Sequence, residues 1–300
     1  MGGTIGIKVD VDTFQGMRNG VPVLLDIFRR HDVKASFFVP MGKDNTGRTV
    51  KRVFTRKGFL KKAGRVGVLS TYGVRTLMYG LLLPGPQIAR RNIALLKRIL
   101  DDGHELGIHG HDHVRWHDSI KYFDEAETRR EIDRLLAVYR MVVGEEARSF
   151  AAPGWMINPF ALRVFEERGL VYSSDTRGVC PFYPEMGGTR FSIVQIPTTL
   201  PTLDEVIGVV SAEEKTLVDH YLTLLANGLN ILTVHTELEG KRWSGFLDAF
   251  LTEAKERGFT FRRLMDIARE FRDMPDGPVC TVEYSSVPGR AGEVCCQKDR

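Results

Sequence analysis

Two carboxylates end an apolar run near the N-terminus, where the sequence reads Lys-Val-Asp-Val-Asp over residues 8–12. In a strand, residues two apart point to the same face, so Asp10 and Asp12 would lie together. Like charges held side by side repel each other, which favours a role in binding a cation or moving a proton over a role in packing. The alternative is that Asp12 caps a turn beside a solvated Asp10.

Histidines cluster in the next group, because His109, His111 and His113 fall within five residues in a chain that has eight histidines. Four residues is about one helical turn, so the first and third imidazoles would share a side. Two histidines and one carboxylate form a ligand set that leaves positions open for water and substrate. We therefore predict that His109 and His113, together with a carboxylate of the first pair, hold one divalent ion, with zinc, cobalt and manganese as candidates. His111 is interpreted as a structural residue or as one that supports the ligands from behind.

A third feature is His235, which ends the apolar run 231–234. In a barrel of alternating strands and helices the active site is built at the C-terminal ends of the strands. Asp10, Asp12, His109, Asp175 and His235 all lie at the C-terminal ends of predicted strands. Their agreement indicates one shared site, although a single histidine at such a place can also be a core residue.

The elements that must position these residues alternate between short β-rich runs and amphipathic stretches, which predicts a parallel sheet. Strands are expected at 4–11, 33–40, 104–110, 147–152, 171–174, 193–197, 230–234 and 259–261. Helices are expected at 21–31, 87–102, 124–143, 159–168 and 243–257. The 300 residues fit one α/β domain, and seven or eight strands favour a distorted (β/α) barrel.

Residues 44–86 form an insertion after the second strand that is far longer than an ordinary loop. Between Arg48 and Leu83 it contains no acidic residue. Its basic residues, interleaved with aromatic and aliphatic ones, are Arg48, Lys51, Arg52, Arg56, Lys57, Lys61, Lys62, Arg65 and Arg75. This composition predicts a basic amphipathic element on an anionic membrane surface. A solvated basic loop is the alternative.

The overall composition restricts the remaining possibilities. A hydrophobic fraction of 43% and a charged fraction of 27% are typical of a globular protein, and the net charge of +4 is no reason to expect a nucleic-acid partner. No protein partner is indicated either. The N-terminus lacks a secretory signal, and the apolar run 77–83 is too short to span a bilayer. Cys180, Cys280, Cys295 and Cys296 are expected to be reduced thiols.

Taken together, these motifs resemble the NodB-type polysaccharide deacetylases, carbohydrate esterase family four, whose fold is a distorted (β/α) barrel. The resemblance implies that Asp10 is the general base, that Asp12 is a metal ligand with His109 and His113, and that His235 is the general acid, supported by Asp175. The family places an arginine that orients the base near Ala151, and this chain has none there. Arg177 is the expected substitute.

Later segments, including 195–197, 200–208 and 289–290, resemble a branch of that family that deformylates a lipid-linked aminosugar. This implies hydrolysis of undecaprenyl-phosphate-linked 4-deoxy-4-formamido-L-arabinose for lipid A modification and polymyxin resistance, at the cytoplasmic face of the bacterial inner membrane. Residues 1–275 would form the barrel, with the insertion, and 276–300 a tail. The alternatives are a deacylase of an N-acetylated sugar or small amide, and a non-catalytic metal- or membrane-binding module.

Overall fold

The computed structural model describes residues 2–51, 72–274 and 276–298, and all eight predicted strands are present within them. The strands are β1 (Thr4–Asp10), β2 (Ser36–Val39), β3 (Glu105–Ile108), β4 (Ser149–Phe150), β5 (Tyr172–Ser173), β8 (Val194–Gln195), β9 (Leu229–His235) and β10 (Thr260–Arg262). Each lies in or within one residue of its expected range. Every residue of β2 and β3 is buried, including the polar Ser36 and Glu105, because helices cover the sheet.

These strands form one parallel sheet in the order β10-β1-β2-β3-β4-β5-β8, and β9 also pairs with β1. One edge of β1 pairs with β10 over its first half and with β2 over its second half, and the other edge pairs with β9. The sheet curves into the predicted distorted (β/α) barrel. β1 is its central strand, since its second half pairs with β2 and its whole length pairs with β9. The buried core side chains of β1 are Ile5, Ile7 and Val9.

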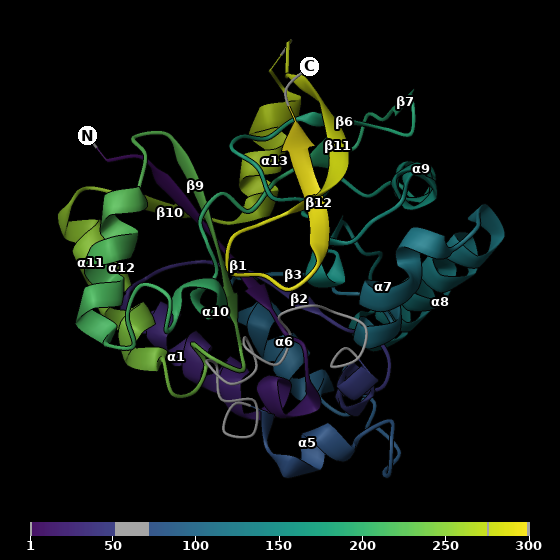
Figure 1. Ribbon diagram of the computed structural model, residues 1–300, viewed down its shortest axis with the longest axis horizontal. Helices are drawn as coiled ribbons and strands as arrows, with labels where there is room; N and C mark the ends of the chain where they lie inside the picture. Colours follow the sequence, from purple (N-terminus) through teal and green to yellow (C-terminus); the bar gives the residue numbers. More distant parts are fainter. Residues whose placement is uncertain (1, 52–71, 275, 299–300) are drawn as a thin grey trace.

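Helices surround this sheet, with α1, α11 and α12 on one side and α8 and α9 on the other (Figure 1). The longer helices are α1 (Val21–Arg30), α6 (Ile93–Asp101), α8 (Glu125–Val143), α9 (Pro159–Glu167), α11 (Glu214–Leu224), α12 (Ser244–Glu256) and α13 (Leu264–Arg272). Shorter helical segments are η1 (Gly16–Gly20), η2 (Thr46–Lys51), α5 (Val74–Met78), α7 (His113–Ser119), η3 (Ile120–Tyr122), η4 (Pro153–Trp155) and α10 (Leu203–Val206). Helices α11 and α13 were not predicted from the sequence.

Helix α6 begins later than predicted, so the expected range 87–102 was wrong at its N-terminal end. Gln87 forms a β-bridge with Lys43, and the backbone N–H of Ile88 donates to the carbonyl of Gly42 at 2.8 Å. These contacts hold the backbone of 87–88 outside a helix. The helix starts only after Asn92, whose side-chain amide donates to the carbonyl of Ile88 at 2.7 Å.

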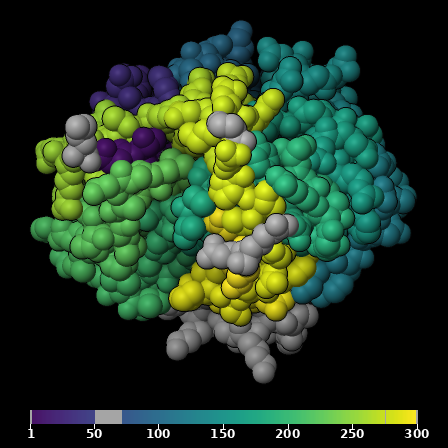
Figure 2. Space-filling view, turned by 90° about the horizontal axis from the view of Figure 1, so that it is seen from above, coloured from purple at the N-terminus to yellow at the C-terminus, as the bar shows by residue number. Residues whose placement is uncertain are grey.

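A second, four-stranded sheet lies against the barrel in the order β12-β11-β6-β7. Its members are β6 (Tyr183–Met186), β7 (Thr189–Arg190), β11 (Val279–Ser286) and β12 (Glu293–Lys298), so the expected tail residues form an antiparallel hairpin. In Figure 2 these C-terminal residues, in yellow, lie across the middle of one face of the molecule. All four cysteines are free thiols, as predicted.

The basic insertion falls largely outside the described residues, because the description omits 52–71. Its described ends contain η2 and α5. Among the residues that the structure describes, no helix is both long enough and apolar enough to cross a membrane.

Candidate metal centre

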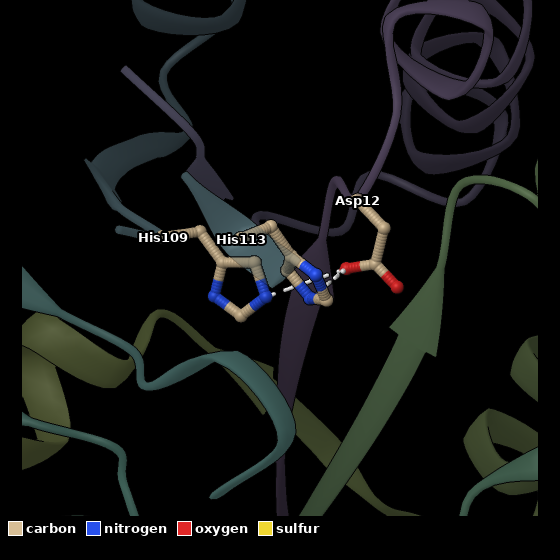
Figure 3. Close-up of side chains that lie close together, drawn as sticks. All are labelled: Asp12, His109 and His113. Carbon is tan, nitrogen blue, oxygen red and sulfur yellow. Dashed lines mark ion pairs between the residues drawn. The ribbon is translucent and has the colours of Figure 1, made fainter. Parts of the chain in front are cut away.

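Asp12, His109 and His113 come together at the C-terminal ends of β1 and β3, as the sequence predicted (Figure 3). Asp12 Oδ1 lies 3.3 Å from His109 Nε2 and 3.2 Å from His113 Nε2. The side chain of His109 is 1% exposed, whereas those of Asp12 and His113 are each 16% exposed. One side of the cluster is therefore buried and the other is accessible to a small molecule.

The two histidines do not share one helical turn, which corrects the local geometry that the four-residue spacing predicted. His109 directly follows β3, and Gly110 then takes a φ of +78°, a conformation open to glycine without strain. His113 is the first residue of α7, and Asp112 is the N-cap of that helix. The Asp112 side chain accepts a hydrogen bond from the backbone N–H of Arg115 at 3.0 Å. A strand end and a helix start therefore bring the two imidazoles together.

The three side chains fit a divalent cation. Ligands about 2.1 Å from a tetrahedral ion lie about 3.4 Å apart, close to the two separations seen here. His109 Nδ1 lies 2.8 Å from the carbonyl of Ala151, so it donates its proton there and leaves Nε2 as a lone-pair donor. Asp12 Oδ1 is buried, and no described residue donates a hydrogen bond to it. An atom of this kind, facing two imidazole nitrogens, is suited to a cation.

Electrostatics also favour an ionised Asp12. Burial by itself would raise the pKa of this carboxyl, but the facing His113 and His109 outweigh that effect and hold the pKa well below its usual range. The carboxylate is the form that binds a metal ion.

Glu237 braces the loop that carries Asp12, and the sequence analysis missed it. Its Oε1 accepts from the backbone N–H of Thr13 at 2.9 Å and from the Thr13 hydroxyl at 2.7 Å. A Cβ on Gly16 would come within 1.9 Å of the same oxygen, so a side chain there would collide with it. Burial and the charge of Asp12 raise the pKa of Glu237 to about 7. An acid two residues beyond His235 was the available signal.

Asp10 and His235 lie side by side, because they are directly paired in the register between β1 and β9. Residues in register on neighbouring parallel strands point to the same face. The backbone N–H of His235 donates to Glu239 at 2.9 Å. Asp10 Oδ1 and His235 Nδ1 are both buried without a hydrogen-bond partner among the described residues. A carboxylate oxygen and an imidazole nitrogen are thus available beside the metal-ligand cluster.

Lys8, not Arg177, is the cation that contacts Asp10, so the expectation for Arg177 was wrong. Lys8 Nζ lies 3.3 Å from Asp10 Oδ2 and donates to the carbonyl of Ser174 at 3.1 Å, and the residue is fully buried. Arg177 instead donates to Glu205 at 2.7 Å and to the carbonyl of Leu200 at 2.9 Å. A lysine two residues before Asp10 in a buried strand was the signal that could have identified this pair.

Asp175 lies two residues beyond β5, where the sequence placed it, but the structure gives it no hydrogen bond to His235. Its Oδ2 accepts from the side-chain amide of Gln195 at 3.0 Å. Burial raises its pKa to about 6, although hydrogen bonds from Gln195 and Ser173 and the charge of Lys8 oppose the rise. Asp175 therefore interacts mainly with Gln195 and Ser173, with a smaller influence from the charge of Lys8.

Comparison with known proteins identifies the family of this chain. The family model described as "Polysaccharide deacetylase" matches residues 4–173. A protein of Shewanella sediminis named as a probable 4-deoxy-4-formamido-L-arabinose-phosphoundecaprenol deformylase, ArnD, is 35% identical over 290 residues, covering 96% of this chain and 92% of the relative. A protein of the same name from Wigglesworthia glossinidia brevipalpis is 31% identical, with 94% and 98% covered.

Solved structures agree on the fold. The crystal structure of a probable polysaccharide deacetylase from Pseudomonas aeruginosa superposes with a TM-score of 0.60 at 19% sequence identity, and the match covers 91% of this chain and 92% of that one. The family model spans more than half of the chain and includes Asp10, Asp12, His109 and His113. The chain belongs to the polysaccharide deacetylase family.

Proposed function

We propose that the chain hydrolyses the formamide of 4-deoxy-4-formamido-L-arabinose carried on undecaprenyl phosphate, which gives formate and the 4-amino-4-deoxy-L-arabinose lipid. The main support is the likeness to proteins named as this deformylase, which extends over 290 residues. The family model, in contrast, ends at residue 173. The sequence likeness therefore continues beyond the part of the chain that the family model covers.

In this proposal Asp12, His109 and His113 hold one divalent ion. An ion bound there supplies a Lewis acid that polarises the amide carbonyl and acidifies water. Zinc, cobalt and manganese all suit two histidines and a carboxylate. The separations near 3.3 Å and the tautomer of His109 support this assignment.

Asp10 and His235 carry the protons. An amide is a poor electrophile with a poor leaving group, so hydrolysis needs a proton taken from water and a proton given to nitrogen. Asp10 Oδ1, which has no hydrogen-bond partner in the described part of the chain, takes the proton of the attacking water. His235 gives a proton to the departing amine. Their pairing across β1 and β9 keeps base and acid together, and Asp175 acts at a distance through the Lys8 charge.

The direct test is mass spectrometry of the purified protein with the formylated lipid-linked sugar. The proposal expects loss of the formyl group and release of formate, and an N-acetylated version of the same sugar serves as the comparison substrate. Hydrolysis of the acetyl compound alone would favour the alternative sugar deacylase. A metal-loaded protein that cleaves neither compound would favour the binding module.

Lys8 holds Asp10 in this proposal and so takes the part of the family's orienting arginine. The ammonium is fully buried, and its neighbours include Asp10, the carbonyl of Ser174 and the rings of Trp155 and Phe38, whose centroids lie 4.9 Å and 5.9 Å away. Burial lowers the pKa of Lys8, and the charge of Asp10 partly restores it. A buried cation with a single close carboxylate fixes the orientation of that carboxylate.

We therefore expect Lys8→Met, which keeps the volume and removes the charge, to lower kcat about 10- to 100-fold, because a hydrogen bond between charged groups contributes about 1.5–3 kcal/mol. Metal content and KM should change little, and Lys8→Arg should recover part of the rate. The control is Lys215→Met, since the side chain of Lys215 is 76% exposed. An unchanged kcat in a folded Lys8→Met protein would contradict the assignment.

The protein is further proposed to bind the cytoplasmic face of the inner membrane through the insertion. Much of that element lies outside the described residues, but its described ends expose apolar side chains. Val74 is 65% exposed and Leu82 is 78% exposed, and Val50 and Leu81 are each 48% exposed. Such side chains beside a basic segment suit the interface of an anionic bilayer.

Charge reversal tests the membrane proposal. The substitutions are Arg52, Arg56, Lys57, Lys61 and Lys62 to Glu. They should release the protein from anionic vesicles in co-sedimentation, because each cation near such a surface contributes on the order of 1 kcal/mol. Turnover of the long-chain substrate should fall, while a short water-soluble analogue should be processed nearly as before. High salt should weaken the binding of the unaltered protein without abolishing it. Unchanged co-sedimentation would refute the membrane role.

A further inference from the structure

Trp155 sits in an unusual setting next to the proposed catalytic residues. It has a φ of +54°, a conformation that residues other than glycine rarely adopt, and its indole N–H donates to the hydroxyl of Thr198 at 3.0 Å. Its ring centroid lies 6.5 Å from that of His235. Strained backbone of this kind persists only where the surroundings hold it, and it is frequent at functional sites.

Three cations surround this indole. Lys8 Nζ lies 4.9 Å from the ring centroid, the Arg177 guanidinium carbon 5.2 Å and the Arg290 guanidinium carbon 4.5 Å. The face of an indole attracts cations, so Trp155 can hold guanidinium groups close together despite their repulsion. Lys8 is directed to Asp10, which leaves the two arginines on the indole without a catalytic role.

The two arginines share one carboxylate. Glu205 Oε1 accepts from Arg177 Nη1 at 2.7 Å and from Arg290 Nη1 at 3.2 Å. Two guanidinium charges against one carboxylate leave about one positive charge unbalanced at the pair. Arg177 Nε is buried without a hydrogen-bond partner, and among the described residues the side chain of Arg290 has a hydrogen bond to Glu205 alone. Donors therefore remain for an anion.

The C-terminal hairpin delivers Arg290 to this place. The connection between β11 and β12 reaches the middle of the molecule in Figure 1. Gly289 has a φ of +81°, and a Cβ there would come within 2.5 Å of the backbone oxygen of Glu205, so only glycine allows so close an approach. The side chain of Arg290 is 10% exposed, which makes it accessible yet partly desolvated.

We propose that Arg290, with Arg177 beside it, binds the phosphate group of the lipid-linked sugar. This inference rests on the proposed function, which gives the substrate a phosphodiester on the sugar carbon across the ring from the formamide. A guanidinium presents paired N–H donors that match two phosphate oxygens, and stacking on an aromatic ring orients that fork beforehand. The contacts from Arg290 through Trp155 to His235 put the anion site one aromatic ring away from the proposed proton donor.

The test compares two substrates that differ only in the phosphate: a short-chain prenyl-phosphate-linked 4-formamido-arabinose and the methyl glycoside of the same sugar. The kcat/KM of the phosphate-linked substrate divided by that of the methyl glycoside measures what the phosphate contributes. Arg290→Gln is expected to lower this ratio about tenfold or more, and Arg290→Lys should lower it less. Inorganic phosphate should inhibit the unaltered protein competitively and the Gln variant more weakly. The control is Arg263→Gln, which should leave the ratio unchanged. The guanidinium of Arg263 pairs with Asp266 and donates to the carbonyl of Gly103, just before β3.

An unchanged ratio in a folded, active Arg290→Gln protein would overturn the inference. If the ratio is unchanged and co-sedimentation with anionic vesicles falls instead, Arg290 contacts membrane lipid headgroups and the substrate assignment is wrong. The failure of the proposed function has a different signature, since the unaltered protein would then hydrolyse neither substrate.

Discussion

Replacing His113 with alanine is expected to remove stoichiometric metal and to lower amide hydrolysis by about a thousandfold or more. The loss of one of three protein ligands leaves Asp12 and His109, and the catalytic contribution of a bound ion amounts to several kcal/mol. The barrel should stay folded, because His113 is the first residue of α7 and its side chain is partly exposed. Metal analysis, thermal unfolding and a rate assay check the three parts of this prediction.

His111→Ala is the matched control, because it removes a histidine two residues away. His111 lines a separate cavity with Gln87, Arg90 and Arg134, and burial together with Arg134 lowers its pKa to about 4. The control should retain its metal. Chelation of the unaltered protein should abolish activity, and re-addition of zinc, cobalt or manganese should restore it. A metal-free His113→Ala protein with full activity would end the case for a catalytic ion.

The second large effect is expected for Asp10→Asn, which should retain the metal while kcat falls about 100- to 10,000-fold. Asparagine has the shape of aspartate and can still accept a hydrogen bond from Lys8, but it cannot take a proton from water. The ligand cluster of Asp12, His109 and His113 does not include Asp10. Parallel measurement of metal content and rate separates the two roles. If both fall together, Asp10 is a metal ligand and the base must be sought elsewhere.

His235→Gln is the companion to that variant, since His235 is paired with Asp10 in the sheet register. A base and an acid that act in one reaction cannot be removed additively, because either loss blocks the same proton transfer sequence. The double variant should therefore be little slower than the slower single variant. Fully multiplicative losses would show that the two residues act independently.

Much of the fold could be predicted because its signals are local. The strands β1, β2, β3 and β9 are short apolar runs, and the caps Asp124 and Asn158 mark the starts of α8 and α9 as their residue types suggest. The end of α6 could also be predicted from the sequence, but its start could not. The bridge between Lys43 and Gln87 decides that boundary, and it joins segments on either side of the insertion.

The sequence by itself determined that carboxylates and histidines would meet at the strand ends, since in a parallel barrel these ends share one face. Only the tertiary structure decided which partners surround them. The register of β1 against β9 puts Asp10 beside His235, and the loop after β9 places Glu237 under the Asp12 loop. Contacts with Glu205 and with the ring of Trp155 hold Arg177 away from Asp10. Such contacts depend on distances between residues that are far apart in the chain. Residue types and their spacing do not determine those distances.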